Sequence, residues 1–341
     1  MALRWGFVCA SKICSDFAAC LRSLPEAHEI VAVAARDIDR AKAFADVHGI
    51  PQAYQGYERI AEDPYVDIAY IGSLHNYHYE LALLMLQHGK HVLCEKPLCL
   101  TETQAKHVIA EARKKNVFFM EAVWSRFFPA YQKIREIIAS GQLGQVKLVL
   151  ASFGDYNIDV ERVRTKATGG GAILDVGIYN IQLASMVYGQ QPTSVSANGY
   201  LLDTGVDGIS SIVLKYPNNT MAVLNSSIMC DFPNEAYIMG ERKKIKICCP
   251  LWSPTRIEIS EAEKIVEVHE FPLPDIKWDF NFRNQSGMQY MATAVGKYIK
   301  EGAKESPIMS HDESILLAGI MDKARHGLGY YFDDETPSPS L

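Results

Sequence analysis

The first third of this chain alternates short apolar runs with helix-like segments, and this alternation constrains the fold more than any other feature. The expected strands are Leu3–Cys9, Glu29–Ala35, Asp67–Ile71, His91–Cys94 and Val117–Ala122. The expected helices between them cover residues 15–24, 40–48, 77–88 and 100–115. Strands that alternate with helices of this length predict right-handed crossovers and a doubly wound parallel sheet. Such a sheet binds ligands beyond the carboxyl ends of its strands.

The pattern changes after residue 125. Helices are expected over 131–140, 169–188 (led by glycines), 287–301 and 312–327, and β-like runs over 145–153 and between 192 and 269. We therefore predict an α/β Rossmann domain at residues 1–124. An α+β domain with a large open, mostly antiparallel sheet follows at residues 125–332, for substrate binding and dimerisation. The acidic, Pro/Ser-rich tail 333–341 is predicted to be disordered.

Charge and composition argue against several classes of protein. The net charge is −6, so the chain has no basic footprint for nucleic acid or an anionic membrane. No apolar run approaches the roughly 18 residues that a membrane span needs, and the N-terminus lacks the pattern of a signal peptide. The 8 cysteines show no zinc-site spacing. We expect a cytoplasmic protein with no membrane or nucleic-acid partner.

The turn after the first strand is the expected site of a dinucleotide pyrophosphate, which binds the backbone amides of the following helix in this fold. It reads Cys9-Ala10-Ser11-Lys12-Ile13-Cys14, without the glycines of a G-x-G-x-x-G/A motif. The most important difference from that motif is Ser11, because it stands at the second glycine, which permits the closest approach of the backbone to the phosphate. Either the serine is accommodated, through a shifted phosphate or its own hydroxyl, or it weakens binding. The predicted cofactor-binding residues of this turn are Ala10, Ser11, Lys12 and Ile13.

The end of the second strand predicts which cofactor is used. NAD-preferring folds place an acid here for the ribose 2′-hydroxyl. This chain has Ala35-Arg36-Asp37, with Arg40 following. A small neutral residue followed by arginine suits a 2′-phosphate, because a planar guanidinium can bond two phosphate oxygens. We predict NADP, read by Arg36 and Arg40; the alternative is a surface arginine paired with Asp37 or Asp39.

Two longer motifs carry a resemblance to a known family. One strand ends in Glu95-Lys96-Pro97, some way after Ile71-Gly72-Ser73, and the second half contains Gly169-Gly170-Gly171-Ala-Ile-Leu-Asp175-Val-Gly177-Ile-Tyr179. Together they resemble the signatures of the glucose–fructose oxidoreductase/inositol dehydrogenase (Gfo/Idh/MocA) family, over nearly the whole chain. The resemblance is greatest to members that oxidise trans-dihydrodiols and D-xylose with NADP.

The resemblance implies Lys96, Asp175 and Tyr179 as catalytic residues, with the tyrosine standing where many members have histidine. Residue chemistry agrees. Oxidising an alcohol requires hydride departure and proton removal, and a tyrosine, with a reference pKa near 10, accepts a proton only beside a cation such as Lys96. Asp175 and Tyr179 are spaced i, i+4 on a helix and share a face, where Asp175 can orient the substrate or Lys96. Tyr179 and Lys96 both remain candidates for the proton acceptor.

Further site residues follow from the same resemblance. The remaining expected cofactor-binding residues are Gly72, Ser73, His75, His78, Glu95 and Lys96, and the Lys96–Pro97 bond is expected to be cis. No metal site is expected, because His75 and His78 lack a third ligand with fitting spacing. An aromatic substrate wall is expected, against the alternative of ordinary core aromatics, from Trp124, Phe127, Phe153, Trp252 and Phe280. Such a wall suits a flat ring with two hydroxyls, or the apolar face of a sugar.

The sequence thus favours NADP-dependent oxidation of trans-dihydrodiols of aromatic hydrocarbons, of aldopyranoses such as D-xylose, or of both. The resemblance also implies a homodimer, and an open sheet with one uncovered face needs a partner surface. Ser11 and Lys12 favour the alternative, a catalytically weak or inactive binding or regulatory homologue. A third possibility is an enzyme of the same fold that acts on another polyol or an imine.

Overall fold

The computed structural model describes residues 2–333 and 335 and groups them into two compact units. Unit 1 runs to Phe128 and includes Pro272–Ile315, whereas unit 2 comprises Pro129–Phe271 and the chain from Leu316 onward. Within the described ranges, no helix has both the length and the apolar character needed to cross a membrane.

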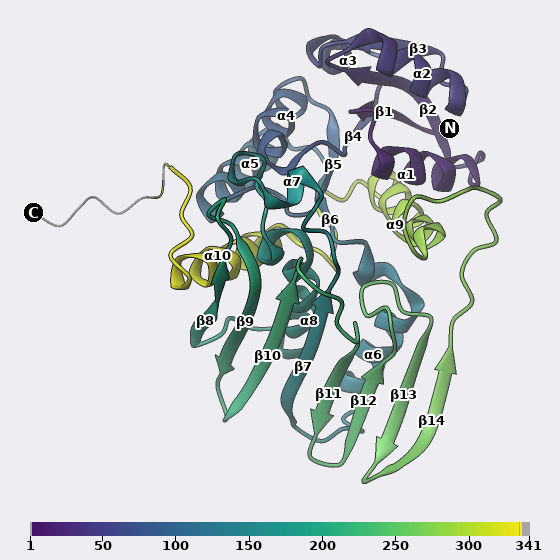
Figure 1. The fold of residues 1–341 in the computed structure, drawn as a ribbon. Coiled ribbons are helices and arrows are strands. Elements are labelled where there is room, and N and C mark those ends of the chain that lie inside the picture. The colour runs from purple at the N-terminus through teal and green to yellow at the C-terminus, as the bar shows by residue number, and fades with distance from the viewer. Residues whose placement is uncertain (1, 334, 336–341) are drawn as a thin grey trace, which may run out of the picture. The chain divides into compact units, whose positions relative to one another are not determined.

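Unit 1 is built on a six-stranded parallel sheet (Figure 1). Its strands are β1 (Leu3–Val8), β2 (His28–Ala35), β3 (Gln52–Gln55), β4 (Ile68–Ile71), β5 (His91–Glu95) and β6 (Phe119–Ala122). The order is β3-β2-β1-β4-β5-β6, and every neighbouring pair is parallel. This order confirms the predicted doubly wound sheet. The strands after β1 are added on one side of it as far as β3, and β4 then begins the other side. Such a switch point, between β1 and β4, leaves a crevice for a ligand at the carboxyl ends of the strands.

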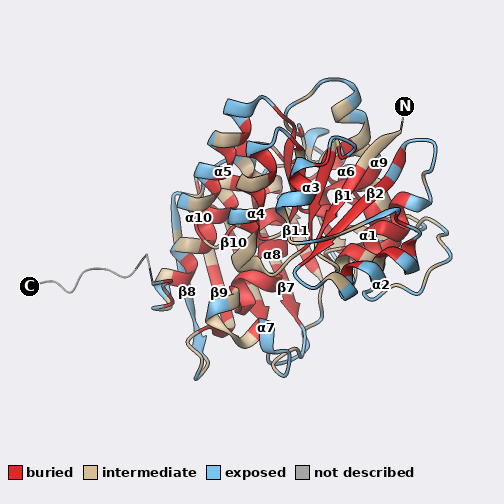
Figure 2. Ribbon diagram, turned by 90° about the horizontal axis from the view of Figure 1, so that it is seen from above, coloured by how far each residue is buried: buried red, intermediate tan, exposed pale blue. Residues whose placement is uncertain are grey.

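Helices accompany each crossover of this sheet. They are α1 (Lys12–Arg22), α2 (Ile38–His48), α3 (Glu58–Glu62), α4 (His75–Gln87) and α5 (Glu102–Lys115). The core is aromatic: Phe17 of α1 lies against Trp5 of β1, and its ring centroid is 4.3 Å from that of Tyr70 of β4. Figure 2 shows β1 and β2 as largely buried, as expected for a parallel sheet covered by helices.

The segment Pro272–Ile315 joins unit 1 although it follows unit 2 in the sequence. Helix α9 (Met288–Lys300), preceded by the 3-10 turn η4 (Gln285–Gly287), packs against α1. The backbone N–H of Asn281 and its side-chain amide donate to the carboxylate of Asp16, at 3.0 and 2.7 Å. Asp16 is fully buried, so these bonds replace the water that its carboxylate loses.

Unit 2 carries an eight-stranded sheet of order β14-β13-β12-β11-β7-β10-β9-β8 (Figure 1). The strands are β7 (Val146–Gly154), β8 (Ser194–Leu201), β9 (Asp207–Tyr216), β10 (Thr220–Ser227), β11 (Ala236–Gly240), β12 (Lys243–Ile247), β13 (Arg256–Glu261) and β14 (Lys264–Glu270). Only the β7–β10 pair is parallel among these described strands. The predicted mostly antiparallel sheet is therefore confirmed.

The two faces of this sheet differ. Helix α8 (Ile178–Tyr188) packs against β7 and β10, and α6 (Pro129–Ala139) packs against α8. Burial alternates along β10, as expected when one face of a strand is covered. The other face bears half-exposed apolar side chains, where Val223 of β10 pairs with Leu150 of β7 and with Val213 of β9.

Several predicted boundaries differ from the observed ones. Two elements, β3 and α3, were not predicted, because both are short and largely polar. The helix expected from Gly169 begins later, because Gly169 and Gly171 have φ values of 75° and 108°, outside the helical region. The predicted division at residues 124 and 125 also differs from the observed grouping, in which 125–128 and 272–315 belong with unit 1. Of the predicted tail 333–341, residues 334 and 336–341 lie outside the described residues.

Candidate active site

The turn between β1 and α1 is held by the side chain of Ser11. Its backbone φ of −108° is ordinary for any residue, so this position does not require glycine here. The hydroxyl accepts a hydrogen bond from the N–H of Cys14 at 3.3 Å, which caps α1. The same hydroxyl donates to the carbonyl oxygen of Gly72 at 2.7 Å. Ser11 therefore joins the turns that follow β1 and β4, the two strands at the switch point.

Two cysteines occupy the outer positions of this turn. Cys9 has a φ of 119°, a value that normally belongs to glycine. Cys14 is fully buried, and a Cβ added at Gly72 would lie only 2.6 Å from its sulfur. Gly72 thus gives the thiol of Cys14 room at the start of α1. The turn therefore brings α1 close to the end of β4 without the glycines of a G-x-G-x-x-G/A motif.

Two arginines follow β2 beside this turn. The guanidinium of Arg40 donates to the carbonyl oxygen of Ala10 at 3.2 Å. The guanidinium of Arg36 lies over the ring of Tyr77, 5.3 Å from its centroid, and donates to the Tyr77 hydroxyl at 3.4 Å. In the described part of the chain, Arg36 forms no ion pair with Asp37 or Asp39. The Asp37 carboxylate instead caps α2, and both guanidiniums are exposed.

The Glu95-Lys96-Pro97 turn after β5 is held from three sides. The Lys96–Pro97 peptide bond is cis, as expected. The Tyr70 hydroxyl donates to the Glu95 carboxyl at 2.6 Å, and burial raises the pKa of that carboxyl to about 7. The backbone N–H of Leu98 donates to Glu121 at 2.8 Å. Lys96 is half-buried and lowers the pKa of Glu95 by its charge, although burial outweighs this effect.

The two histidines of this region have different environments. The third contact of the turn comes from His78, whose ring nitrogens lie 2.8 Å from the carbonyl oxygen of Pro97 and 3.2 Å from that of Ser73. His78 is fully buried, and burial lowers its pKa to about 4, so the ring is neutral near pH 7. His75 begins α4 and is half-buried. No cluster of three metal-ligand side chains occurs among the residues that the structure describes.

The glycine run of unit 2 brings a short helix against the backbone. A Cβ at Gly170 would lie 2.3 Å from the carbonyl oxygen of Val163, in α7 (Glu161–Arg164), so only glycine fits there. The chain then enters a π-helical turn (Ile173–Gly177) that carries Asp175, and π-helical turns occur often at functional sites. The Asp175 carboxylate accepts a hydrogen bond from the Arg162 guanidinium at 3.0 Å.

Tyr179, on the first turn of α8, belongs to an aromatic cluster. Its ring centroid lies 5.7 Å from that of Phe153 at the end of β7. Phe153 in turn stacks on Trp252, with centroids 3.9 Å apart and an interplanar angle of 5°. Two of the five predicted wall residues therefore lie together beside a predicted catalytic residue. Trp252 is half-buried and follows the cis bond between Cys249 and Pro250.

A buried polar chain connects the Trp252 loop to α8. The Tyr131 hydroxyl donates to the carbonyl oxygen of Leu251 at 3.0 Å. The Gln182 amide donates to the Tyr131 oxygen and to the carbonyl oxygen of Tyr179, both at 3.1 Å. Tyr131 and Gln182 are fully buried. These hydrogen bonds were not predicted, because neither Tyr131 nor Gln182 lies near a motif.

The other three predicted wall residues belong to unit 1. Trp124 and Phe127 lie in a 3-10 turn (Trp124–Phe127) and are almost fully buried. Trp124 meets Phe128 edge to face, with centroids 5.2 Å apart. Phe280 is half-buried and precedes Asn281, which binds Asp16.

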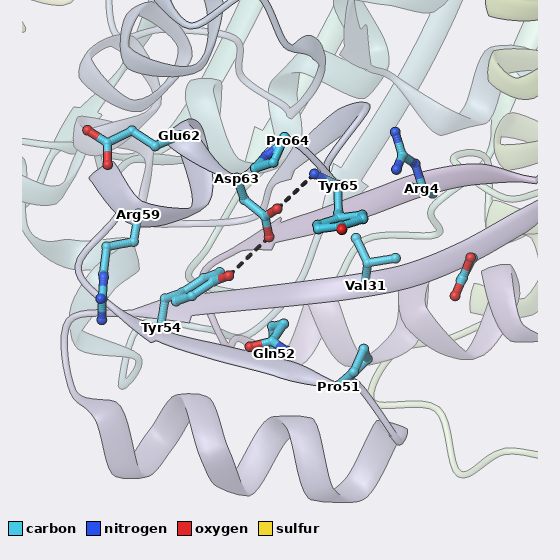
Figure 3. A pocket seen from close by; sticks show the side chains of 11 residues that line it. Arg4, Val31, Pro51, Gln52, Tyr54, Arg59, Glu62, Asp63, Pro64 and Tyr65 are labelled. Carbon is cyan, nitrogen blue, oxygen red and sulfur yellow. Dashed lines mark hydrogen bonds between the residues drawn. The ribbon is translucent and has the colours of Figure 1, made fainter.

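A cavity of about 630 Å³ lies elsewhere in unit 1 (Figure 3). Its lining includes Arg4, Gln52 and Tyr65, at or just before the amino ends of β1, β3 and β4. The cofactor turns lie at the carboxyl ends of these strands. Asp63 of this cavity accepts bonds from Tyr54 and from the N–H of Tyr65 (Figure 3). The cavity is therefore distinct from the predicted cofactor site.

Comparisons with known proteins match both halves of the chain. Residues 3–123 match the oxidoreductase family with an NAD-binding Rossmann fold (GFO_IDH_MocA), and residues 131–246 match the GFO/IDH/MocA C-terminal domain. The trans-1,2-dihydrobenzene-1,2-diol dehydrogenase of Xenopus tropicalis is 45% identical over 331 residues, covering 96% of this chain and 99% of the relative. The protein of that name from Homo sapiens is 42% identical, covering 98% of this chain and 99% of its own.

Solved structures show the same fold at low sequence identity. A 3-ketoreductase from Actinomadura kijaniata, in complex with NADP and TDP-benzene, has a TM-score of 0.81 and 24% identity, covering 96% of this chain and 98% of that one. A levoglucosan dehydrogenase in complex with NADH and levoglucosan has a TM-score of 0.84 and 19% identity, with the same coverage.

Proposed function

The chain belongs to the Gfo/Idh/MocA family of oxidoreductases, and on that premise we propose that it oxidises trans-dihydrodiols of aromatic hydrocarbons with NADP. Two relatives above 40% identity over almost the whole chain carry the name of a dihydrodiol dehydrogenase. The observation that carries the proposal is the stacked pair of Phe153 and Trp252 beside Tyr179. Such flat aromatic surface suits a cyclohexadiene ring. D-xylose and other aldopyranoses are a second substrate class, because their C–H faces also pack on aromatic rings.

The choice of NADP rests on the arginines after β2. Arg36 and Arg40 supply two exposed guanidiniums beside the β1–α1 turn, and Arg36 is braced by Tyr77. A guanidinium matches the paired oxygens of a phosphate, and β2 ends in Ala35 where an NAD-preferring fold has an acid. The eleven-residue helix α1 would offer the backbone N–H groups of its first turn to the pyrophosphate, apart from that of Cys14, which donates to the Ser11 hydroxyl. Ala10, Ser11, Lys12, Ile13, Gly72 and Ser73 complete the proposed cofactor-binding turns.

We assign the catalytic roles to Lys96, Asp175 and Tyr179. The cofactor, when bound, supplies the hydride acceptor. Lys96 stabilises Tyr179 in its phenolate form, and this phenolate accepts the proton of the reacting hydroxyl as the hydride leaves the carbon that bears it. Asp175 orients the substrate. The buried contacts of Glu95, His78 and Glu121 hold the turn that carries Lys96. His75 is proposed to lie at the cofactor, whereas both ring nitrogens of His78 already contact carbonyl oxygens.

The alternative of a binding protein without turnover rests on Ser11 and Lys12, and Ser11 is the departure from the glycine motif. That serine has an ordinary backbone conformation and two hydrogen bonds that build the turn. Ser11 thus takes the place of a glycine without disrupting the turn. This favours an active enzyme over a binding protein without turnover.

A homodimer forms part of the proposal. The half-exposed face of the unit 2 sheet carries neighbouring apolar side chains, among them Leu150, Val213 and Val223. Contiguous apolar surface of this kind marks an interaction site. A change of Val223 to Asp should shift the purified protein from dimer to monomer in analytical ultracentrifugation. A wild-type monomer would reject the dimer.

The function is tested with the purified protein in two steps. NADPH and NADH are first titrated by fluorescence, and tighter binding of NADPH is expected. Reduction of NADP⁺ is then followed with trans-1,2-dihydrobenzene-1,2-diol and with D-xylose. Turnover of the diol supports the main proposal, and turnover of xylose alone replaces the diol with the sugar class. Cofactor binding without turnover of either would favour another polyol or a regulatory role, and no cofactor binding would reject the enzyme.

A further inference from the structure

We propose that Arg162 is a positioning residue that holds the Asp175 carboxylate in its productive orientation. The inference rests on the proposed function, because it concerns the same reaction. Arg162 has no place in either family-like motif of the sequence. Only the structure connects it to the site.

The contact itself is between a guanidinium and a largely buried carboxylate. Nη1 of Arg162 lies 3.0 Å from Oδ1 of Asp175. The Asp175 side chain is 8% exposed and that of Arg162 41% exposed, so the arginine reaches from the surface to the buried acid. A buried carboxylate needs charged or hydrogen-bonding partners to offset its lost hydration. Arg162 supplies both a charge and a directed donor.

The backbone around Arg162 is fixed by the segment that leads to Asp175. The Thr168 hydroxyl donates to the carbonyl oxygen of Arg162 at 2.8 Å. The N–H of Gly171 donates to the carbonyl oxygen of Val163, also at 2.8 Å. A side chain at Gly170 would collide with that same carbonyl. The glycine run thus lets α7 lie directly on the chain preceding the π-helical turn, which sets the distance between Arg162 and Asp175.

Arg162 would affect the reaction through the position of Asp175 rather than through contact with the substrate. Asp175 sits one helical turn before Tyr179, so a tilt of the π-helical turn would move both groups. A misplacement of about 1 Å in a reacting group can lower turnover by about 10²-fold. Lysine would keep the charge but lose the planar donor geometry, so it should restore the role only in part.

The same short helix provides a matched control. Arg164 pairs with Asp203 at 3.1 Å, but the Asp203 side chain is 80% exposed. Such an exposed pair contributes little to stability. R164A therefore removes an arginine from α7 with almost no expected effect on the site.

The pair is tested first without turnover. A double-mutant cycle of R162A and D175N, measured by denaturant unfolding, should show coupling of about tenfold in the unfolding equilibrium constant. A cycle of R164A and D203N should show almost none. Absence of coupling between Arg162 and Asp175 would overturn the inference whatever the activity.

The positioning role is tested by kinetics on folded variants. R162A should lower kcat/KM for the diol by about 10²-fold, with NADPH affinity unchanged and R164A like wild type. R162K should lie between R162A and wild type, and added guanidinium should partly restore R162A. If the wild type oxidises the diol and R162A and R164A have the same kcat/KM, the positioning role is overturned and the proposed function is not. If the wild type does not oxidise the diol, the proposed function and the positioning role are both overturned. The double-mutant cycle would still measure the coupling between Arg162 and Asp175.

Discussion

The Ser11 hydroxyl donates to the carbonyl oxygen of Gly72 at 2.7 Å while it caps α1 through the N–H of Cys14. One side chain therefore closes the turn where a glycine-rich sequence would be expected. We predict that S11A lowers the free energy of unfolding by about 1–2 kcal/mol, because it removes a helix cap and a hydrogen bond. Denaturant titration measures the loss.

S11T is the matched control for this prediction, since it keeps the hydroxyl and should lose less stability than S11A. S11G should keep NADPH affinity within a few-fold of wild type. If S11G instead binds NADPH far more tightly, the serine obstructs the phosphate and the turn is degenerate after all.

Much of the fold could be predicted because its signals are local. Buried parallel strands such as β4 are continuous apolar runs, and the helices between them have ordinary lengths. The short strand β3, with the sequence Gln-Ala-Tyr-Gln, lies at the sheet edge and lacks that signal. The return of Pro272–Ile315 to unit 1 depends on contacts such as Asn281 with Asp16, which no local pattern encodes.

The site was predictable only where motifs mark it. Lys96, Asp175 and Tyr179 stand in motifs, whereas Arg162 was missed because it lies in a short charged segment that resembles any surface helix. The second role of Ser11 was missed for a related reason. Its partner, the Gly72 carbonyl, belongs to the backbone of a distant turn.

Arg36 should discriminate between the two cofactors. R36D removes a donor to the 2′-phosphate and adds a repelling charge, so NADPH affinity should fall at least about 10- to 100-fold. NADH affinity should change little. Fluorescence titration measures both. R22D, at an exposed arginine of α1, serves as the charge-matched control. Equal losses of affinity for NADPH and NADH would show that Arg36 does not bind the 2′-phosphate.

Tyr179 should be needed for chemistry but not for cofactor binding. Y179F removes the proposed proton acceptor and should lower kcat by about 10²- to 10⁴-fold, with NADPH binding retained. K96M should have a similar effect. Y188F makes the same change on the same helix, at a hydroxyl that donates to the carbonyl oxygen of Met221. Y188F should turn over like wild type; normal turnover in both Y179F and K96M would end the catalytic assignment.

Glu121 should make stability depend on pH in an unusual direction. It is fully buried beneath the Lys96 turn, and burial raises its pKa from 4.5 to about 7. The folded protein therefore keeps this proton up to about pH 7, whereas the unfolded chain releases it near pH 4.5. Because the folded state binds more protons in that window, this group makes stability fall as pH rises through it.

The Glu121 contribution can be isolated by substitution. The buried histidines His28, His48 and His78, with pKa values lowered to about 4, act in the opposite direction over part of the window. Comparison of E121Q with wild type cancels their contributions. The glutamine carbonyl can still accept the bond from Leu98, so E121Q should gain stability over wild type by up to about 3 kcal/mol between pH 4.5 and pH 8. E136Q, at an exposed glutamate, should show no such trend. A difference between E121Q and wild type that stays constant from pH 4.5 to pH 8 would mean that the pKa of Glu121 is not raised in the folded protein, and that the Lys96 turn rests on a charged carboxylate at neutral pH.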